Sequence, residues 1–296
     1  MKILLTGKSG QVGYELERSL QGLGDVVAVD RAQMDLSDLN CVREVVRAVK
    51  PTLIINPAAY TAVDLAENES DLAMRINAEV PKVFAEEALA LGAALIHYST
   101  DYVFDGEKVG PYVEDDIPNP QNVYGKSKLA GEQAIQASGV SYLILRTSWV
   151  YGMRGKNFLR TVQRLAQERD ELRIVADQVG APTWCRTIAD TTAHIVSQLQ
   201  ARSGKNSRNV IDEDVWRAHS GLYHLTAQGQ TSWHGFTQAI VAHASTTKKP
   251  HVVPIATKDY PLPAKRPQNS TLSCERFINT FCDLPRWDEA LKLCLD

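Results

Sequence analysis

Three glycines near the start of the chain join a short apolar run to an amphipathic segment, and no other feature constrains the fold as strongly. The run Ile3–Thr6 is predicted to be a buried strand, and apolar residues return after Gly13 at helical spacing. Glycine permits a tight turn and close approach of the backbone to a pyrophosphate, and the following helix offers free N–H groups. A plain turn with a cap glycine is the alternative, but the strand–turn–helix context favours a dinucleotide site. Its predicted residues are Gly7, Gly10, Gln11, Val12 and Gly13.

The second predicted strand ends at Asp30, which points to the adenosine half of such a dinucleotide. An acid at this place binds the ribose hydroxyls and favours NADH. The neighbouring Arg31 can instead receive a 2′-phosphate, so the choice between NADH and NADPH stays open. Asp35 and Leu36 follow, and we expect them beside the adenine, with a helix N-cap near Asp38 as the alternative interpretation.

Strands and helices alternate along the first half of the chain, which predicts an α/β fold. We expect a doubly wound, Rossmann-type parallel sheet in a dinucleotide-binding domain spanning residues 1–152. Residues 153–296 are then mainly a smaller substrate-binding lobe, with parts of 184–230 returning to the first domain. The charged segment 201–220 is predicted to be a surface excursion.

The carboxyl ends of the third and fourth predicted strands supply further candidate site residues. Small residues after the third strand let a nucleotide lie against the backbone. The fourth strand ends near Tyr98 and delivers Thr100, whose hydroxyl can bond a substrate carbonyl; a turn or cap role is the alternative. The further residues predicted at these strand ends are Ala58, Ala59, Tyr60, Thr61 and Tyr98 for the coenzyme and Asp101 and Tyr102 for the substrate.

Tyr124 and Lys128 are four residues apart, so on a helix they share one face. Two unit charges about 4 Å apart at an effective dielectric of about 20 interact by roughly 4 kcal/mol. This sets a ceiling of roughly three units on the fall in the tyrosine pKa from about 10, and desolvation cancels part of it. We therefore expect Tyr124 to have a lowered pKa and to protonate a developing alkoxide during carbonyl reduction. Alone the pattern is common on solvated helix faces; the glycine loop favours the catalytic interpretation.

Two later features are open to two interpretations each. Trp149 follows a predicted strand and either belongs to the core or stacks on a sugar ring. The segment Arg266–Ser270 either meets phosphates or is a rigid basic loop.

The composition excludes some classes of protein. The chain has 296 residues, a net charge of −3 and no basic excess, so we expect no nucleic-acid partner. No apolar run approaches the roughly 20 residues of a membrane span, and the first residues indicate a strand rather than a secretory signal. The five cysteines are scattered without a CxxC pair, which predicts reduced thiols in a cytoplasmic protein.

The motifs together resemble the short-chain dehydrogenase/reductase superfamily, in its extended nucleotide-sugar branch. Within that branch the chain is most similar to the dTDP-4-dehydrorhamnose reductases, and the resemblance spans nearly the whole chain. It is carried by residues 7–13, 99–106, 122–132, 146–151, 180–183 and 266–270.

The resemblance implies that NADPH or NADH gives hydride to C4 of dTDP-4-dehydro-L-rhamnose, in the last step of dTDP-L-rhamnose synthesis. Tyr124 would supply the proton, and Lys128 would acidify it and hold the nicotinamide ribose. Thr100 would take the place of the catalytic Ser or Thr. By the same resemblance, Asp101, Tyr102 and Trp149 would meet the sugar, and Arg266 and Asn269 the diphosphate.

Some alternatives remain within this resemblance. A dehydratase of the branch carries Thr-Asp-Glu where this chain has Tyr102 in third place. A reductase or epimerase of another 4-keto sugar nucleotide is possible, as is a binding protein similar to the regulatory subunit of methionine adenosyltransferase. Some family members use Mg2+ at a dimer contact, but Arg186 is a poor ligand and Glu15 alone makes no site, so we expect no metal. We expect a monomer or a homodimer.

Overall fold

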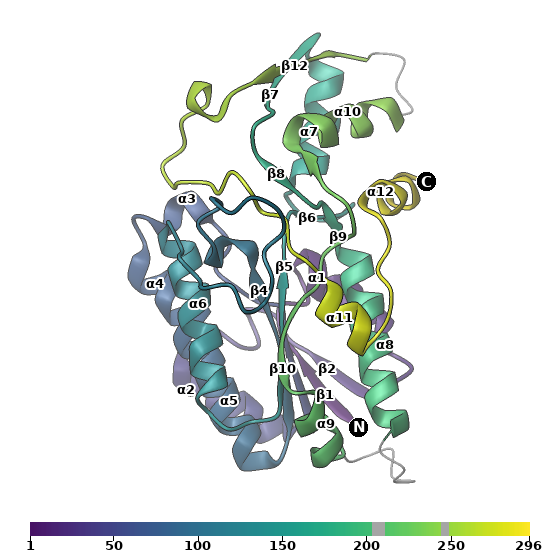
Figure 1. The fold of residues 1–296 in the computed structure, drawn as a ribbon. Coiled ribbons are helices and arrows are strands. Elements are labelled where there is room, and N and C mark those ends of the chain that lie inside the picture. Colours follow the sequence, from purple (N-terminus) through teal and green to yellow (C-terminus); the bar gives the residue numbers. More distant parts are fainter. Residues whose placement is uncertain (203–210, 244–248) are drawn as a thin grey trace.

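The computed structural model describes residues 1–202, 211–243 and 249–296, and it shows helices on both faces of a central sheet with a smaller lobe beyond one edge (Figure 1). Within these ranges, none of the helices combines the length and apolar character that crossing a lipid bilayer requires.

The central sheet has six strands in the order β10-β5-β4-β3-β1-β2, and every neighbouring pair is parallel. The order reverses between β1 and β3, which is where doubly wound sheets bind nucleotides. The predicted α/β fold is therefore confirmed. The strands are β1 (Lys2–Leu5), β2 (Asp25–Ala28), β3 (Leu53–Asn56), β4 (Ala94–Thr100), β5 (Tyr142–Thr147) and β10 (Gly221–His224).

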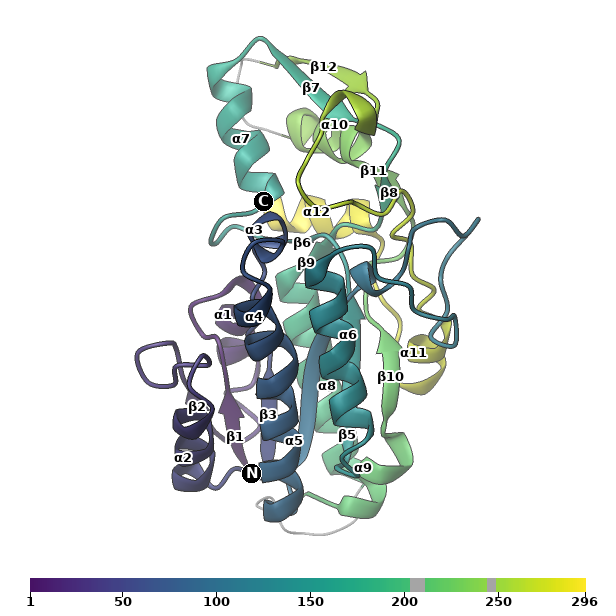
Figure 2. The ribbon, with the colours of Figure 1, turned by 90° about the vertical axis from the view of Figure 1, so that its left-hand side faces the viewer.

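Successive residues of each strand point alternately into two hydrophobic layers, one on each face of the sheet. Helices therefore cover both faces of the sheet (Figures 1 and 2). Ile3 and Leu5 join a cluster that includes Ile188, and Leu4 joins the other with Phe84. One face carries α2 (Leu39–Val49), α4 (Ser70–Met74), the π-helical turn η1 (Arg75–Glu79), α5 (Val80–Leu91) and α6 (Val123–Gln136). The other carries α1 (Gln11–Ser19), α8 (Cys185–Arg202) and α11 (Glu275–Thr280).

The smaller lobe is built around its own apolar cluster, in which Leu159, Phe236 and Leu291 are fully buried. Three short strand pairs and three helices form it: β6 (Val150–Tyr151) with β9 (Thr183–Trp184), β7 (Glu171–Val175) with β12 (His251–Ile255), β8 (Val179–Gly180) with β11 (Thr231–Ser232), α7 (Phe158–Glu168), α10 (Trp233–His243) and α12 (Trp287–Leu295). Between these pieces the chain returns to the sheet, since α8 packs on α1 and β10 pairs with β5. The remaining short elements are α3 (Val63–Ala66), η2 (Asp101–Val103), α9 (Glu213–His219) and η3 (Thr257–Asp259).

The predicted surface excursion over residues 201–220 is wrong where the structure describes it. Residues 203–210 lie outside the described residues, but α9 follows them and buries Trp216 in the core beside the sheet. Ile211 is buried as well. These apolar side chains anchor an otherwise polar segment, and the high charge of their neighbours concealed them.

A buried ion pair fixes α6 against β5. Arg146 donates from Nε and Nη2 to the two carboxylate oxygens of Glu132, at 2.9 and 2.6 Å. The two side chains are only 3% and 1% exposed. Removing one partner from such a pair leaves an uncompensated buried charge, so this contact sets the position of the helix that carries Tyr124 and Lys128.

We predict that Arg146→Met lowers the free energy of unfolding by about 3–5 kcal/mol, because the carboxylate of Glu132 stays buried without a counter-charge. Arg164→Met is the matched control, since its ion pair with Glu168 is exposed and contributes about 0.5 kcal/mol or less. Urea unfolding of both variants measures the difference. Equal losses would show that the buried pair does not fix the helix.

Candidate active site

The glycine loop forms a cradle at the N-terminus of α1. Gly10 is the N-cap and contributes no side chain, so the first N–H groups of the helix stay free for an anion. A Cβ on Gly13 would lie 2.1 Å from the carbonyl oxygen of Gly7, so only glycine allows the loop to close on the helix. This geometry suits the pyrophosphate of a dinucleotide.

Acidic and basic side chains meet at the end of β2, where the adenosine half of a dinucleotide would lie. Lys8 from the glycine loop lies 3.7 Å from the carboxylate of Asp30 and donates to Gln33 at 2.5 Å. Arg31 is largely exposed and lies 3.8 Å from Asp35. Asp38 caps α2 by accepting from two backbone N–H groups, as the alternative interpretation of this region expected.

Asn77 ties the loop after β3 to α6. Its side chain accepts from the backbone N–H of Tyr60 at 2.8 Å and donates to the carbonyl of Tyr60 and to the hydroxyl of Ser127. Asn77 lies in the π-helical turn η1, between α4 and α5. Such turns often mark functional sites, and this one holds the loop against the helix between Tyr124 and Lys128.

The start of α6 is fixed by its cap and by close packing. Asn122 caps the helix by accepting from the N–H of Gly125 and donates to the carbonyl of Lys265. A Cβ on Gly125 would lie 2.1 Å from the carbonyl oxygen of Tyr102, so a larger residue would push the helix away. Tyr124 is therefore held beside Tyr102, with the two rings edge to face at 5.5 Å.

The structure corrects the predicted pKa of Tyr124. Burial raises it from the usual 10 to about 12, and the hydrogen bond with Thr100 opposes the rise only partly. Nζ of Lys128 does not bind the phenol: it donates to the carbonyl of Tyr98 at 2.6 Å and lies 3.1 Å from Nε2 of His97. The expected fall is wrong for the protein alone, since desolvation outweighs the neighbouring charge.

One cavity of about 860 Å³ brings together all the residues predicted to bind a coenzyme. Its lining includes both ends of the predicted site, from the glycine loop to Tyr124 and Lys128. The sixteen predicted residues on its wall are Gly7, Gly10, Gln11, Val12, Gly13, Asp30, Arg31, Asp35, Leu36, Ala58, Ala59, Tyr60, Thr61, Tyr98, Tyr124 and Lys128.

A second cavity of about 910 Å³ lies between the sheet and the smaller lobe. Tyr102 and Arg266 line it, and Tyr102 packs against Tyr124, which lines the first cavity. Arg266 is held by Asp64 at 2.7 Å. The other cationic groups on its wall are Arg169, Arg173 and Lys265, and the apolar ones include Phe158, Leu172, Trp233 and Pro261–Pro263.

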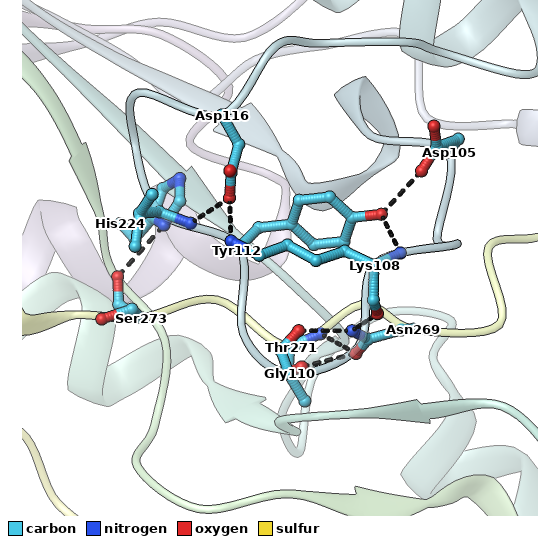
Figure 3. A network of polar contacts seen from close by, with 10 residues as sticks. Asp105, Lys108, Gly110, Tyr112, Asp116, His224, Asn269, Thr271 and Ser273 are labelled. Carbon is cyan, nitrogen blue, oxygen red and sulfur yellow. Dashed lines mark hydrogen bonds and ion pairs between the residues drawn. The ribbon is translucent and has the colours of Figure 1, made fainter.

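Four of the six residues predicted to meet the substrate line neither cavity: Thr100, Asp101, Trp149 and Asn269. Thr100 and Asp101 are buried, and the hydroxyl of Thr100 donates to the carboxylate of Asp101 at 3.0 Å. Trp149 stacks on Trp233 with ring centroids 3.5 Å apart and takes a positive φ of 49°, an uncommon conformation for a bulky residue. Asn269 donates to the carbonyls of Lys108 and Gly110 and accepts from Thr271, as Figure 3 shows. In this structure the side-chain NH2 group of Asn269 therefore holds the loop that begins at Asp105, and its amide oxygen binds Thr271.

Comparison with known proteins identifies the family. The family described as RmlD substrate binding domain matches residues 1–296. A dTDP-4-dehydrorhamnose reductase from Burkholderia thailandensis is 47% identical, over 100% of this chain and 98% of that protein. Solved structures of such reductases from Clostridium acetobutylicum and Bacillus anthracis both align with a TM-score of 0.88, at 38% and 34% identity. They cover 100% and 99% of this chain and 99% and 98% of their own; the second is in complex with NADP.

The chain belongs to the RmlD family. Glu15, one residue considered for the metal contact of some relatives, accepts from Nε of Arg186 at 3.2 Å. In the part of the chain that the structure describes, no three His, Cys, Asp or Glu side chains gather in a way that would hold a metal ion.

Several polar residues on the wall of the first cavity were not predicted from the sequence, among them Ser99, Thr147 and Lys156. Ser99 and Thr147 line it from the ends of β4 and β5, and their buried hydroxyls have no hydrogen-bond partner among the described residues. Their place at adjacent strand ends was a usable signal. Lys156 lines the same cavity from the loop before α7, and nothing in its local sequence marked it.

The effect of burial on ionisable groups in the site can be tested at Asp101. Burial raises the pKa of its carboxyl to about 6 despite hydrogen bonds from Ser270 and Thr100. Since the folded pKa of about 6 lies above the unfolded value of 3.8, ionisation of Asp101 costs stability as the pH rises from about 4 to 6. The cost is complete above pH 6, is small near pH 4 and vanishes at lower pH, where both states are protonated.

We predict that Asp101→Asn raises the free energy of unfolding by about 2–3 kcal/mol at pH 8 and changes it little at pH 4. Asp116→Asn is the control of opposite sign, because its hydrogen bond with Lys108 lowers the pKa of Asp116. That variant should lose stability at pH 8. Urea unfolding at both pH values measures the effects, and a destabilised Asp101→Asn at pH 8 would contradict the burial argument.

Proposed function

We propose that this protein reduces the C4 carbonyl of dTDP-4-dehydro-L-rhamnose with NADPH or NADH, giving dTDP-L-rhamnose in the last step of that synthesis. The observation that carries the proposal is the place of Tyr124, which lines the cavity below the glycine loop and packs against Tyr102 on the wall of the second cavity. The reductase names of relatives up to 47% identical over the full chain support it.

The residues around the first cavity suit a nicotinamide coenzyme. The glycine cradle and the free end of α1 would hold the pyrophosphate, and the unpaired hydroxyls of Ser99 and Thr147 would meet polar groups near Tyr124. A structure of a relative in complex with NADP supports this choice. When bound, the coenzyme supplies the hydride.

The second cavity suits a nucleoside diphosphate sugar. Arginine matches phosphate oxygens with paired N–H groups, and Arg169, Arg173 and Arg266 lie on its wall. The aromatic and apolar residues beside them, such as Phe158, offer a surface for the base. We assign the sugar end to the side of Tyr102, because this side adjoins the proton donor.

Tyr124 acts as the acid in this scheme. Its phenol is fully protonated at neutral pH, and its hydrogen bond with Thr100 orients the hydroxyl. Lys128 orients the coenzyme ribose from the same face of α6. Elimination of water as in a dehydratase is not supported, because Tyr102 stands in place of the second acid and burial raises its pKa further.

The proposed function also divides the chain into two functional parts. We take residues 1–152, with α8 and β10, as the coenzyme domain and most of 153–296 as the substrate lobe. The five cysteines form no disulfide bond in the structure, as expected of a protein in the reducing cytoplasm.

The direct test follows NADPH and NADH oxidation by absorbance with dTDP-4-dehydro-L-rhamnose made from dTDP-glucose by the upstream dehydratase and epimerase. Substrate-dependent oxidation yielding dTDP-L-rhamnose is expected. Coenzyme binding without turnover would instead favour a regulatory binding protein or another keto-sugar substrate.

We predict that Tyr124→Phe keeps coenzyme affinity within about threefold and lowers kcat by about 10²–10⁴, because only the proton donor is lost. Tyr223→Phe is the control, since its hydroxyl donates to the carbonyl of His219 away from both cavities. NADPH titration by fluorescence and steady-state rates measure the two effects. Turnover at the parent rate would refute Tyr124 as the acid.

We also predict that Asp30→Ala raises the KM for NADH by about tenfold and the KM for NADPH much less. The carboxylate would bind the ribose hydroxyl, whereas Lys8 and Arg31 would remain for a 2′-phosphate. Asp25→Ala, exposed at the opposite end of β2, should change neither KM. A loss that is the same for both coenzymes would remove Asp30 from the ribose site.

A further inference from the structure

The ammonium of Lys128 is held from β4 by two acceptors. Nζ lies 2.6 Å from the carbonyl oxygen of Tyr98 and 3.1 Å from Nε2 of His97. An ammonium has three donors and no acceptor. Two donors are thus directed at β4, and Lys128 also lines the coenzyme cavity. The direction of its third N–H depends on both acceptors.

His97 extends this contact into a chain of buried side chains that crosses the sheet. Its Nδ1 lies 3.1 Å from Nδ2 of Asn56, its register partner on β3. The amide oxygen of Asn56 accepts from the hydroxyl of Thr6 at 2.7 Å. All four side chains, from Thr6 to Lys128, are at most 2% exposed. Water therefore does not replace any of these bonds.

The donors and acceptors of these hydrogen-bonded side chains can be assigned in two consistent ways. A neutral imidazole has one donor and one acceptor nitrogen. If Nε2 of His97 accepts from the ammonium, its proton sits on Nδ1, and Asn56 must turn its oxygen to the ring and its NH2 group to Thr6. If Asn56 instead donates to Nδ1, the ring N–H on Nε2 faces Lys128, which then must be an uncharged amine. The two amide orientations have the same shape.

We propose that His97 is a positioning residue: with its proton on Nδ1 and held by Asn56, it accepts a hydrogen bond from Lys128 and aims the remaining ammonium N–H into the coenzyme cavity. The effect on turnover rests on the proposed function, whereas the effect on coenzyme affinity does not. No step of the reaction needs His97 to touch coenzyme or substrate.

The charges around this contact favour the neutral ring. Burial and the adjacent Lys128 lower the pKa of His97 well below its usual value. Burial also lowers the pKa of Lys128 to about 8, and Glu132 on the next turn of α6 opposes that fall. Glu132 is itself paired with Arg146 on β5. Tyr124, another titratable group on α6, lines the same cavity as Lys128.

Two substitutions separate positioning from packing. In His97→Gln the side-chain amide reaches the place of Nε2 and keeps an acceptor for Lys128. In His97→Asn the amide reaches only the place of Nδ1, so the link to Asn56 stays and the acceptor is lost. Both variants change the packing of β4, but only the second leaves the ammonium with one protein acceptor.

We expect His97→Asn to raise the KM and the dissociation constant for NADPH by about tenfold and to lower kcat by at least a similar factor. Its kcat should also fall at a pH about one unit lower than in the parent, because the charged form of Lys128 loses an acceptor. His97→Gln should stay within about threefold of the parent in each quantity. A merely structural role would lower the melting temperature of both variants alike and leave their kinetics equal, which would overturn the proposal.

A measurement on the parent protein keeps the test independent of folding and of the reaction. After sequential assignment, the nitrogen chemical shifts of His97 at pH 7 should show the proton on Nδ1; a proton on Nε2 would overturn the proposal. If the parent reduces no dTDP-sugar, the proposed function fails, and NADPH affinities of the three proteins still decide the role of His97.

Discussion

The burial of one ammonium group governs the arrangement of this site. Lys128 is 2% exposed, and a charge so placed needs strong partners. They come from consecutive residues of β4, the carbonyl of Tyr98 and the ring of His97. The helix that carries Lys128 must therefore lie close across the end of β4, and this closeness places Tyr124 beside Thr100. The position of Tyr124, the proposed proton donor, is thus a consequence of how α6 docks.

Several unrelated contacts enforce the same docking. The ion pair between Glu132 and Arg146 holds the middle of α6, and Asn77 holds its second turn through Ser127. The cap residue Asn122 joins the start of the helix to the segment around Lys265, which lines the second cavity. A shift of α6 would disturb both cavities together. The contacts that hold the helix in place therefore also fix the geometry of the site.

The sequence predicted those structural features that depend on local residue patterns. It did not predict the features that depend on contacts between residues far apart in the sequence. The parallel sheet and the coenzyme wall follow from periodicity and from strand ends, and all sixteen predicted coenzyme residues line one cavity. The burial of Trp216 within a polar segment depends on how α9 packs against the core beside the sheet. The stacking of Trp149 on Trp233 joins residues far apart in sequence, as does the loop-holding role of Asn269. The network through His97 likewise needs three strands in register, which no local pattern encodes.

The raised pKa of Tyr124 changes what Lys128 contributes. In the proposed reaction, the phenol of Tyr124 with its pKa of about 12 is still a far stronger acid than an alcohol. Proton transfer to a new alkoxide is therefore favourable by several pKa units without help from a neighbouring charge. What the reaction requires of Lys128 is then mainly orientation, since a misplacement of about 1 Å can cost roughly a hundredfold in rate. This requirement explains why its ammonium is bonded to the sheet rather than to the phenol.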